Sequence, residues 1–364
     1  MSASAQATGR TALDQEKMQQ FAAKMVGVLN AGALAVMTSL GHRTRLFDVL
    51  ATLPASTSAE IAAAAGLAER YVREWLAAMV TGGVIEYDGT TDRYLLPREH
   101  AAFLTRAARP NNIAVNAQFV PLIARLEDRM LECFERGEGL PYEAYERFHE
   151  VMAEASDQSV VAKLFDQILP LVPGLVERLE GGIDVLDIGC GAGRAICALA
   201  ERFPASRFMG IDLCRDAIAM ANDEANRRRL ANVSFRRANF SALEARPRYD
   251  LITTFDAIHD HPDPQLLIET IGRLLRADGV YLLQEPHGTS KLDDDRSLPV
   301  ATFLYAISTM HCTAVSLGQG GAGPGTLWGE ERLRALLDKA GFRRVAKHVL
   351  QKDLVGMFLV ARLG

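Results

Sequence analysis

The most constraining feature of this sequence is a hydrophobic run that ends in closely spaced glycines. Val185-Leu-Asp-Ile leads into Gly189-Cys-Gly-Ala-Gly-Arg194, and a second apolar run ends at Asp212. Glycines let a ligand approach the backbone closely, and a carboxylate at the end of the next strand accepts hydrogen bonds from ribose hydroxyls. The two runs together predict a doubly wound α/β sheet that binds a nucleoside at the carboxyl ends of its strands.

The second half of the chain alternates strand and helix patterns, as a parallel sheet with helices on both faces requires. The predicted strands cover Asp184–Ile188, Arg207–Asp212, Val233–Arg237, Tyr249–Phe255, 279–284, 343–350 and 354–362, with the last two as a hairpin. The predicted helices lie near 193–203, 214–230, 264–277 and 330–340. Residues 176–364 are therefore expected to form one domain around a mostly parallel, seven-stranded sheet.

The first half of the chain follows other patterns. Residues 1–20 are interpreted as a flexible tail, and residues 21–40 as a helix with little polar surface. Residues 41–106 show three helical segments and a strand–turn–strand segment, the order of a winged helix. We therefore predict a winged-helix domain over 21–109 and a helical linker over 110–175 that covers the pocket.

The winged-helix interpretation makes specific local predictions. Helices are expected over 42–53, 58–65 and 69–82, and the wing strands over 84–87 and 93–96. Thr57 or Ser58 is the predicted N-cap of the second helix, and Gly66 is its stop. The third helix is expected to bury Tyr71, Val72, Trp75, Leu76 and Met79.

Composition limits the classes of function. The 364 residues are 49% hydrophobic and 23% charged, as in an ordinary globular protein of two domains. A net charge of -5 disfavours nucleic-acid binding, which relies on clustered Lys and Arg. The cysteine spacings match no metal site, so we expect no metal and a cytoplasmic location. Lys24 and Asn30 interrupt the apolar segment 21–40, which favours a buried or interface helix over a membrane span.

The residues beside the glycines distinguish between cofactors. A dinucleotide fold usually has a third glycine where Arg194 stands, which counts against a nicotinamide dehydrogenase. A carboxylate at Asp187 would repel a pyrophosphate but could accept a hydrogen bond from an ammonium group, either directly or through a water molecule. The spacing therefore favours a cofactor with a cationic amino-acid end.

These motifs resemble those of class I S-adenosylmethionine-dependent methyltransferases, over about residues 160–364. The glycine segment is similar to their first motif, and Asp212 matches their ribose-binding acid. Ala238-Asn-Phe240 resembles their adenine-contacting segment, with Asn239 in place of the usual Asp. The resemblance implies S-adenosylmethionine as the cofactor, bound by Asp187, Gly189, Cys190, Gly191, Gly193, Asp212, Leu213, Asn239, Phe240, Phe255 and Asp256.

The fourth strand leads into Ile258-His-Asp260, at the edge where open α/β sheets place their chemistry. This segment resembles the His-Asp-Trp signature of winged-helix small-molecule O-methyltransferases, whose histidine is the general base, with His261 in place of the Trp. A histidine with a pKa of about 6.5 can accept the proton of a phenol or alcohol at neutral pH. The resemblance thus implies His259 and Asp260 as catalytic residues. The alternative is that His259 caps the following turn or orders the cofactor loop.

Further polar residues are expected near the acceptor. Some close the fifth strand, and others flank a glycine-rich run over 318–325, whose length implies a mobile or tightly folded binding element. The candidates for substrate contact are His261, Glu285, His287, His311, Cys312 and Trp328. Packing or loop capping is the alternative for each of them. The aromatic residues Tyr142, Tyr145, Phe148 and Phe165 either line a pocket or pack in the core.

The third helix of the winged-helix pattern does not look like a DNA reader. Its charged residues Glu69, Arg70, Arg73 and Glu74 cancel, whereas a recognition helix exposes Arg, Lys, Asn or Gln. In the O-methyltransferases that this arrangement resembles, the domain serves dimerisation and covers the active site. We therefore expect a homodimer formed through the N-terminal helices, with a small-molecule substrate and without membrane or nucleic acid.

The expected reaction is methyl transfer from S-adenosylmethionine to a small-molecule acceptor, with a hydroxyl as the favoured acceptor group. Two alternatives stay open. One is N-, C- or S-methyl transfer without a base. The other is a winged-helix transcriptional regulator that binds S-adenosylmethionine.

Overall fold

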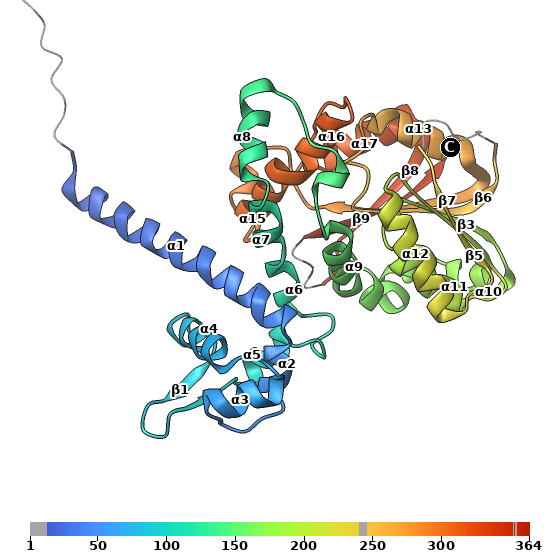
Figure 1. The fold of residues 1–364 in the computed structure, drawn as a ribbon. Helices are drawn as coiled ribbons and strands as arrows, with labels where there is room; N and C mark the ends of the chain where they lie inside the picture. The colour runs from blue at the N-terminus through green and yellow to red at the C-terminus, as the bar shows by residue number, and fades with distance from the viewer. Residues whose placement is uncertain (1–12, 240–245, 352, 354) are drawn as a thin grey trace, which may run out of the picture. The chain divides into compact units, whose positions relative to one another are not determined.

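The computed structural model describes residues 13–239, 246–351, 353 and 355–364. The chain divides into two compact units, Met1–Thr105 and Arg106–Gly364 (Figure 1). The division lies a few residues before the predicted boundary at 109. The helical segment that we predicted as a linker belongs to the second unit.

The N-terminal unit begins with a long helix, α1 (Gln15–Arg43). Residues 15–20, predicted as part of a flexible tail, are therefore helical. Asp14 explains the early start, because its carboxylate accepts hydrogen bonds from the backbone N–H groups of Glu16 and Lys17 at 3.1 and 3.2 Å.

The next helix differs from its prediction. The single helix expected over 42–53 is wrong, because α1 continues to Arg43 and a separate short helix, α2 (Leu46–Leu50), follows. Arg45 separates the two with a left-handed backbone, φ 62°. Such a conformation cannot continue a right-handed helix.

The winged-helix pattern is confirmed. Its remaining elements are α3 (Ser58–Ala65), α4 (Glu69–Thr81), β1 (Glu86–Asp88), β2 (Arg93–Leu95) and α5 (Arg98–Leu104), with β1 and β2 antiparallel. Thr57 caps α3 through a capping box, and Gly66 ends it in a left-handed conformation. Tyr71 is 80% exposed, which corrects its predicted burial. The other four residues predicted for the buried face of α4 are buried.

The second unit is built on a seven-stranded sheet of order β5-β4-β3-β6-β7-β9-β8. Its strands are β3 (Asp184–Ile188), β4 (Arg207–Asp212), β5 (Val233–Arg237), β6 (Tyr249–Phe255), β7 (Leu275–Pro286), β8 (Phe342–His348) and β9 (Gly356–Leu363). Strand β9 runs antiparallel to both of its neighbours, and the other pairs are parallel. The predicted mostly parallel sheet with a terminal hairpin is confirmed.

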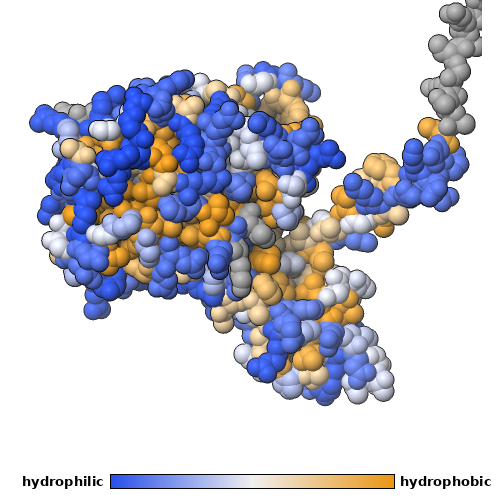
Figure 2. All heavy atoms as spheres, turned by 180° about the vertical axis from the view of Figure 1, so that it is seen from behind, coloured by the Kyte–Doolittle hydropathy of each residue, from blue (hydrophilic) through white to orange (hydrophobic). Residues whose placement is uncertain are grey.

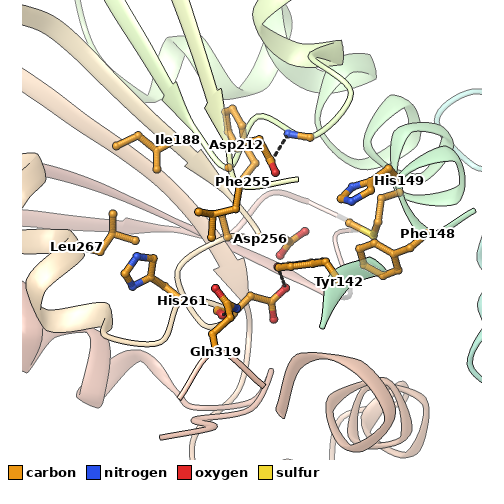
Figure 3. A pocket seen from close by; sticks show the side chains of 16 residues that line it. Tyr142, Phe148, His149, Ile188, Asp212, Phe255, Asp256, His261, Leu267 and Gln319 are labelled. Atoms are coloured by element: carbon orange, nitrogen blue, oxygen red, sulfur yellow. Dashed lines mark hydrogen bonds between the residues drawn. The ribbon is translucent and has the colours of Figure 1, made fainter. Parts of the chain in front are cut away.

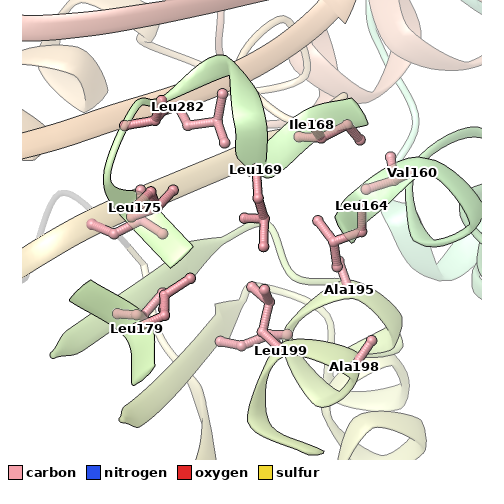
Figure 4. Packing of buried hydrophobic residues seen from close by; sticks show 14 of the residues in the cluster. Val160, Leu164, Ile168, Leu169, Leu175, Leu179, Ala195, Ala198, Leu199 and Leu282 are labelled. Carbon is pink, nitrogen blue, oxygen red and sulfur yellow. The ribbon is translucent and has the colours of Figure 1, made fainter. Parts of the chain in front are cut away.

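Hydrophobic clusters cover both faces of this sheet. Consecutive residues of a strand point to opposite faces. Accordingly, Val185 joins one cluster and Leu186 the other. Figure 4 shows the first cluster, in which Leu164, Leu175 and Leu199 pack together. Because both faces are buried, the central strands read as continuous apolar runs in the sequence.

The helices that surround the sheet follow the predicted alternation. They are α10 (Leu175–Gly181), α11 (Arg194–Arg202), α12 (Arg215–Arg228), α13 (Pro264–Leu274) and α17 (Glu330–Lys339). Helix α13 begins where Asp263 accepts a hydrogen bond from the Leu266 N–H at 2.9 Å. It ends earlier than predicted because β7 begins at Leu275.

Further helices precede the sheet or follow β7, and some of them form a cover at the edge where the parallel strands end, where Figure 1 shows α7, α8 and α15 gathered. They are α6 (Ala114–Ala117), α7 (Phe119–Ala124), α8 (Glu127–Arg136), η1 (Tyr142–Ala144), α9 (Phe148–Ser159), η2 (Val161–Lys163), η3 (Leu164–Ile168), η4 (Leu169–Leu171), α14 (Leu292–Asp295), α15 (Ala301–Ile307), η6 (Ser308–Cys312) and α16 (Thr313–Gly318). Phe119, Phe148 and Val315 share one buried cluster, so segments from before and after the sheet's central strands build the cover together.

The glycine-rich run 318–325 is tightly folded. A Cβ on Gly318 would lie 2.6 Å from the backbone oxygen of Leu140, and one on Gly321 would lie 2.5 Å from Cα of Pro262. The glycines therefore permit close backbone approach between the cover and the loop after β6.

Helix α1 has an unusual apolar surface (Figure 2). Its exposed large hydrophobic residues include Met18, Phe21, Met25, Val26, Val28 and Leu29, each at least 41% exposed. Among the described helices, α1 is long and apolar enough to cross a membrane, and the bent pair of residues 148–171 and 175–181 passes the same test together. Length and composition alone do not separate a membrane span from a helix that covers a partner.

Candidate active site

The glycine turn after β3 has the geometry of a ligand cradle. Gly189, Gly191 and Gly193 have φ values of 71°, 51° and 70°, which favour glycine. A Cβ at Gly189 would lie 2.5 Å from Cβ of Ala257, so this position also lacks room for a side chain. A Cβ at Gly191 would meet nothing within 4 Å, so the backbone there faces open space. The turn can therefore bring its backbone against a ligand.

Asp212 stands at the end of β4, beside this turn. Its Oδ2 accepts a hydrogen bond from the Gly191 N–H at 2.9 Å (Figure 3), and its Oδ1 accepts one from the Cys214 N–H at 2.8 Å. Burial raises the pKa of Asp212, although these backbone donors oppose the shift. A carboxylate has about four lone-pair sites, so two hydroxyl donors can still be accommodated.

One cavity opens at the ends of the parallel strands. It is lined by Tyr142, Phe148, His149, Met152, Ile188, Gly189, Gly191, Asp212, Leu213, Phe255, Asp256, Ala257, Asp260, His261, Leu267 and Gln319. Figure 3 shows Ile188 and Leu267 on one side and the cover residues Phe148 and His149 on the other. Glycine backbone, a carboxylate and apolar side chains in one cavity fit the ribose and base of a nucleoside cofactor.

The structure places some of the predicted cofactor residues on the cavity wall and others elsewhere. Gly189, Gly191, Asp212, Leu213, Phe255 and Asp256 line the cavity. Cys190 and Gly193 belong to the turn but are not part of the lining. Asn239 is exposed, and Phe240 lies outside the described residues.

Asp187 lies behind the cavity wall and is 3% exposed. Its Oδ1 accepts a hydrogen bond from the Thr253 hydroxyl at 2.7 Å. Burial raises the pKa of Asp187 to about 7. The carboxylate therefore ties β3 to β6 and is not part of the cavity lining.

Glu285 orients His259. His259 Nδ1 lies 2.6 Å from Glu285 Oε2, and the Ile258 N–H donates to Glu285 Oε1 at 3.0 Å. The Trp328 Nε1–H, which can only donate, also reaches Glu285 Oε2, at 3.0 Å. Glu285 is thus an acceptor on both oxygens, and Nδ1 of His259 carries the hydrogen of the shared bond.

This arrangement corrects two predicted substrate contacts. Glu285 is 0% exposed and Trp328 is 2% exposed, and neither lines the cavity. Glu285 meets His259 because β6 and β7 pair in parallel, which places the ends of both strands side by side. The sequence alone did not identify the carboxylate that orients the histidine.

The other imidazole nitrogen of His259 points to Asp260. Its Nε2 lies 3.5 Å from Asp260 Oδ1, and Asp260 Oδ2 accepts a hydrogen bond from the Tyr142 hydroxyl at 3.0 Å. Burial disfavours the charged imidazole, but Glu285 and Asp260 outweigh it and raise the pKa of His259 well above its ordinary value. His259 is 3% exposed and lies behind Asp260, which lines the cavity.

The remaining predicted substrate residues have separate surroundings. His261 lines the cavity, and burial lowers its pKa. His287 is half-buried and is not part of the cavity lining. His311 stacks on Phe148 with ring centroids 3.8 Å apart, and burial lowers its pKa to about 4. Cys312 is buried next to His259 and Asp260.

Some residues that line the cavity belong to no motif that was recognisable in the sequence. His149 and Met152 come from α9 and Gln319 follows α16, so all three belong to the cover. His149 stacks on Tyr142, with ring centroids 5.9 Å apart. Its Nε2 is buried without a hydrogen-bond partner in the part of the chain that the structure describes. The aromatic residues around 142–148 were the only sequence indication of this wall.

Comparison with known proteins agrees with this geometry. Residues 32–106 match the family model described as Rv2258c-like winged HTH domain, and residues 179–341 match a methyltransferase domain model. The mitomycin 7-O-methyltransferase MmcR has a similar structure, with a TM-score of 0.67 and 17% identity over 96% of this chain and 100% of that one. Human N-acetylserotonin methyltransferase, solved with S-adenosylmethionine, gives a TM-score of 0.67 and 18% identity over 98% of this chain and 100% of that one.

A relative in sequence covers a shorter stretch. A ubiquinone biosynthesis O-methyltransferase of Leptothrix cholodnii is 29% identical over 142 residues, which are 38% of this chain and 60% of that protein. The match therefore spans less than two thirds of the relative. The two domain models, the sheet order and the glycine cradle of this chain together show a methyltransferase domain that uses S-adenosylmethionine as cofactor, preceded by a winged-helix domain.

Proposed function

We propose that this protein transfers the methyl group of S-adenosylmethionine to a hydroxyl of a small molecule. The observation that carries the proposal is the chain of contacts from Glu285 through His259 to Asp260, which ends at the cofactor cavity. When bound, the cofactor supplies an electrophilic methyl group, and a hydroxyl attacks such a group well only after losing its proton. The three side chains supply a place for that proton.

Each residue has a distinct part in the proposal. The glycine turn and Asp212 hold the cofactor, and apolar Leu213 and Phe255 pack against it. Asp260 lies on the cavity wall and accepts the acceptor's O–H hydrogen bond. Because the pKa of His259 is raised well above its ordinary value, the imidazole is neutral only at alkaline pH, and the rate should rise as the pH rises toward that pKa. In the neutral form, His259 takes the proton at Nε2, and Glu285 stabilises the resulting imidazolium through Nδ1–H. Because Asp260, Tyr142 and Phe148 line the same cavity, we propose a compact acceptor that lies against Tyr142 and Phe148.

The assay is methyl transfer to a panel of small phenols, alcohols, amines and thiols, followed by mass spectrometry of both products. We expect S-adenosylhomocysteine and a methyl ether to accumulate together with hydroxyl acceptors. Turnover with amines or thiols alone would replace the O-methyl assignment by one of the alternatives. Binding of S-adenosylhomocysteine without transfer, combined with a DNA gel shift, would favour the regulator.

Two ion pairs within α4 of the winged-helix domain argue against sequence recognition of DNA by this helix. Arg70 forms an ion pair with Glu74, and Arg73 lies 3.2 Å from Glu69, both within α4. Arginines that pair along their own helix are less available for phosphate or base contacts. We therefore propose that this domain serves protein association rather than nucleic-acid recognition.

We further propose a homodimer formed through α1. Phe21 and Leu29 are 63% and 70% exposed on this helix, and apolar surface of this kind marks interaction sites. The double variant Phe21→Glu with Leu29→Glu is expected to shift the protein from dimer to monomer in light scattering after size exclusion. Gln19→Glu, which changes a polar position of the same helix, should leave the mass unchanged. A wild-type monomer would contradict the proposal.

A cytoplasmic location also remains part of the proposal. All five cysteines are free thiols, as a reducing compartment favours.

A further inference from the structure

Three buried side chains converge beside the cofactor cavity. His259 Nε2, an Asp260 carboxylate oxygen and Cys312 Sγ all lie within 4.8 Å of one another, and His259 Nε2 is 3.5 Å from Asp260 Oδ1. A tetrahedral Zn²⁺ has bonds of about 2.0–2.3 Å to such atoms, which places its ligands about 3.3–3.8 Å apart. The pair of His259 Nε2 and Asp260 Oδ1 has this spacing, and Cys312 Sγ lies within 4.8 Å of both side chains' ligand atoms.

The hydrogen bonds of His259 aim a lone pair at this point. The indole of Trp328 and the backbone N–H of Ile258 only donate, so Glu285 accepts throughout and Nδ1 carries a hydrogen. In the neutral imidazole, Nε2 then presents a lone pair toward Asp260 Oδ1. That oxygen is also an acceptor, and it is buried without a hydrogen-bond partner among the residues described. In the metal-free protein the raised pKa of His259 places a proton on Nε2, facing this oxygen, and a metal ion bound at this point would take the place of that proton.

The residues that hold His259 and Asp260 in place also match those of a metal site. Metal-binding histidines usually donate their other ring N–H to a carboxylate, which fixes the tautomer and the ring. Glu285 has this place at 2.6 Å from Nδ1 and is itself held by Trp328. Asp260 is held by the Tyr142 hydroxyl through its other oxygen. The donors are thus oriented by neighbours that stay outside the site.

We propose that His259, Asp260 and Cys312 form a binding site for a divalent transition-metal ion of the zinc class, with one coordination position left open. Imidazole, carboxylate and thiolate suit Zn²⁺ and Co²⁺, whereas Mg²⁺ and Ca²⁺ prefer oxygen ligands alone. On binding, the metal forms bonds to Nε2, Oδ1 and Sγ, and two protons are released to solvent, one from Nε2 of the charged imidazole and one from the thiol of Cys312.

The site would act as an inhibitory switch. A metal bonded to Nε2 occupies the atom that the proposed base uses to accept a proton. This consequence rests on the proposed function, whereas the binding itself does not. We therefore expect added Zn²⁺ to stop methyl transfer and EDTA to restore it.

The test uses Co²⁺ as a spectroscopic probe of the full-length protein after EDTA treatment, with S-adenosylhomocysteine present. We expect a thiolate-to-cobalt charge-transfer band and tetrahedral visible bands that saturate at one equivalent. Cys312→Ser should lose the charge-transfer band. Cys133→Ser, a buried cysteine of α8 outside the cluster, should keep it. Glu285→Gln should weaken Co²⁺ binding by roughly 10- to 100-fold.

A wild-type protein that shows no charge-transfer band would overturn the proposal, and so would a band that persists in folded Cys312→Ser. If Cys312→Ser fails to fold in a thermal melt, His259→Gln decides the matter, because loss of the tetrahedral bands supports the site and their retention rejects it. These readouts need no acceptor. Failure of the methyl-transfer proposal would leave the cobalt spectra unaffected, so the two failures are distinguishable.

Discussion

Asp212→Ala is expected to abolish most of the thermal stabilisation that S-adenosylhomocysteine gives the wild-type protein. A ligand at about 100 times its Kd stabilises the folded state by about 2.7 kcal/mol, which corresponds to a shift of roughly 5–10 °C for a domain of this size. The carboxylate that we assign to the ribose hydroxyls is the polar side chain at the end of β4, so its loss removes charge-assisted hydrogen bonds. Differential scanning fluorimetry with and without ligand measures the shift.

The comparison has to use ligand-induced shifts rather than melting temperatures. Asp212 also accepts the N–H groups of Gly191 and Cys214, so its removal lowers the stability of the free protein as well. Asp216→Ala is the matched control, because this carboxylate lies nearby in the sequence, in the first turn of α12, and its side chain is 75% exposed. A full shift in Asp212→Ala would contradict the role of Asp212 in cofactor binding.

His259→Ala is expected to lower the rate of methyl transfer by roughly 10²- to 10⁴-fold while the S-adenosylhomocysteine shift stays near the wild-type value. The reason is that His259 contacts Asp260 and is the proposed proton acceptor, but it is not part of the cavity lining. Other residues line the part of the cavity that we assign to the cofactor. Single-turnover measurements of the methylated product separate this chemical step from cofactor binding.

Two further variants sharpen the result. Glu285→Gln keeps the volume of the side chain but offers an amide N–H where His259 needs an acceptor, so the favoured tautomer changes and the rate should also fall. His100→Ala changes an exposed histidine of the N-terminal unit and should leave the rate unchanged. A rate in His259→Ala equal to that of the wild type would reject the proton-acceptor role.

Local sequence patterns predicted much of the fold of the second unit, Arg106–Gly364. The β3 strand and the glycine turn were recognisable because positive φ angles and close packing at Gly189 leave little choice of residue. The strands flanked by helices were recognisable because burial on both faces produces continuous apolar runs. Boundaries were less accurate where capping by Asp14 or a left-handed residue such as Arg45 set the limits of a helix.

The candidate site was only partly predictable. His259 and Asp260 are adjacent in the sequence and follow a strand, so their place at the sheet edge was foreseeable. Their partners come from distant parts of the chain: Glu285 from β7, Tyr142 from the cover and Cys312 from η6. No spacing in the sequence relates these residues, because the contact depends on how the strands pair and how the cover packs.

The sequence by itself therefore determined the sheet, the glycine cradle, the place of Asp212 at the end of β4 and the cofactor class, since each depends on neighbouring residues or on a regular period. Only the tertiary structure decided that Glu285 holds the ring of His259 and that Asp187 is tied to Thr253 rather than facing the cavity. It also decided that His259, Asp260 and Cys312 meet at one point. The physical reason is that hydrogen-bond partners in a buried site are chosen by distance in space, which parallel strand pairing and helix packing set.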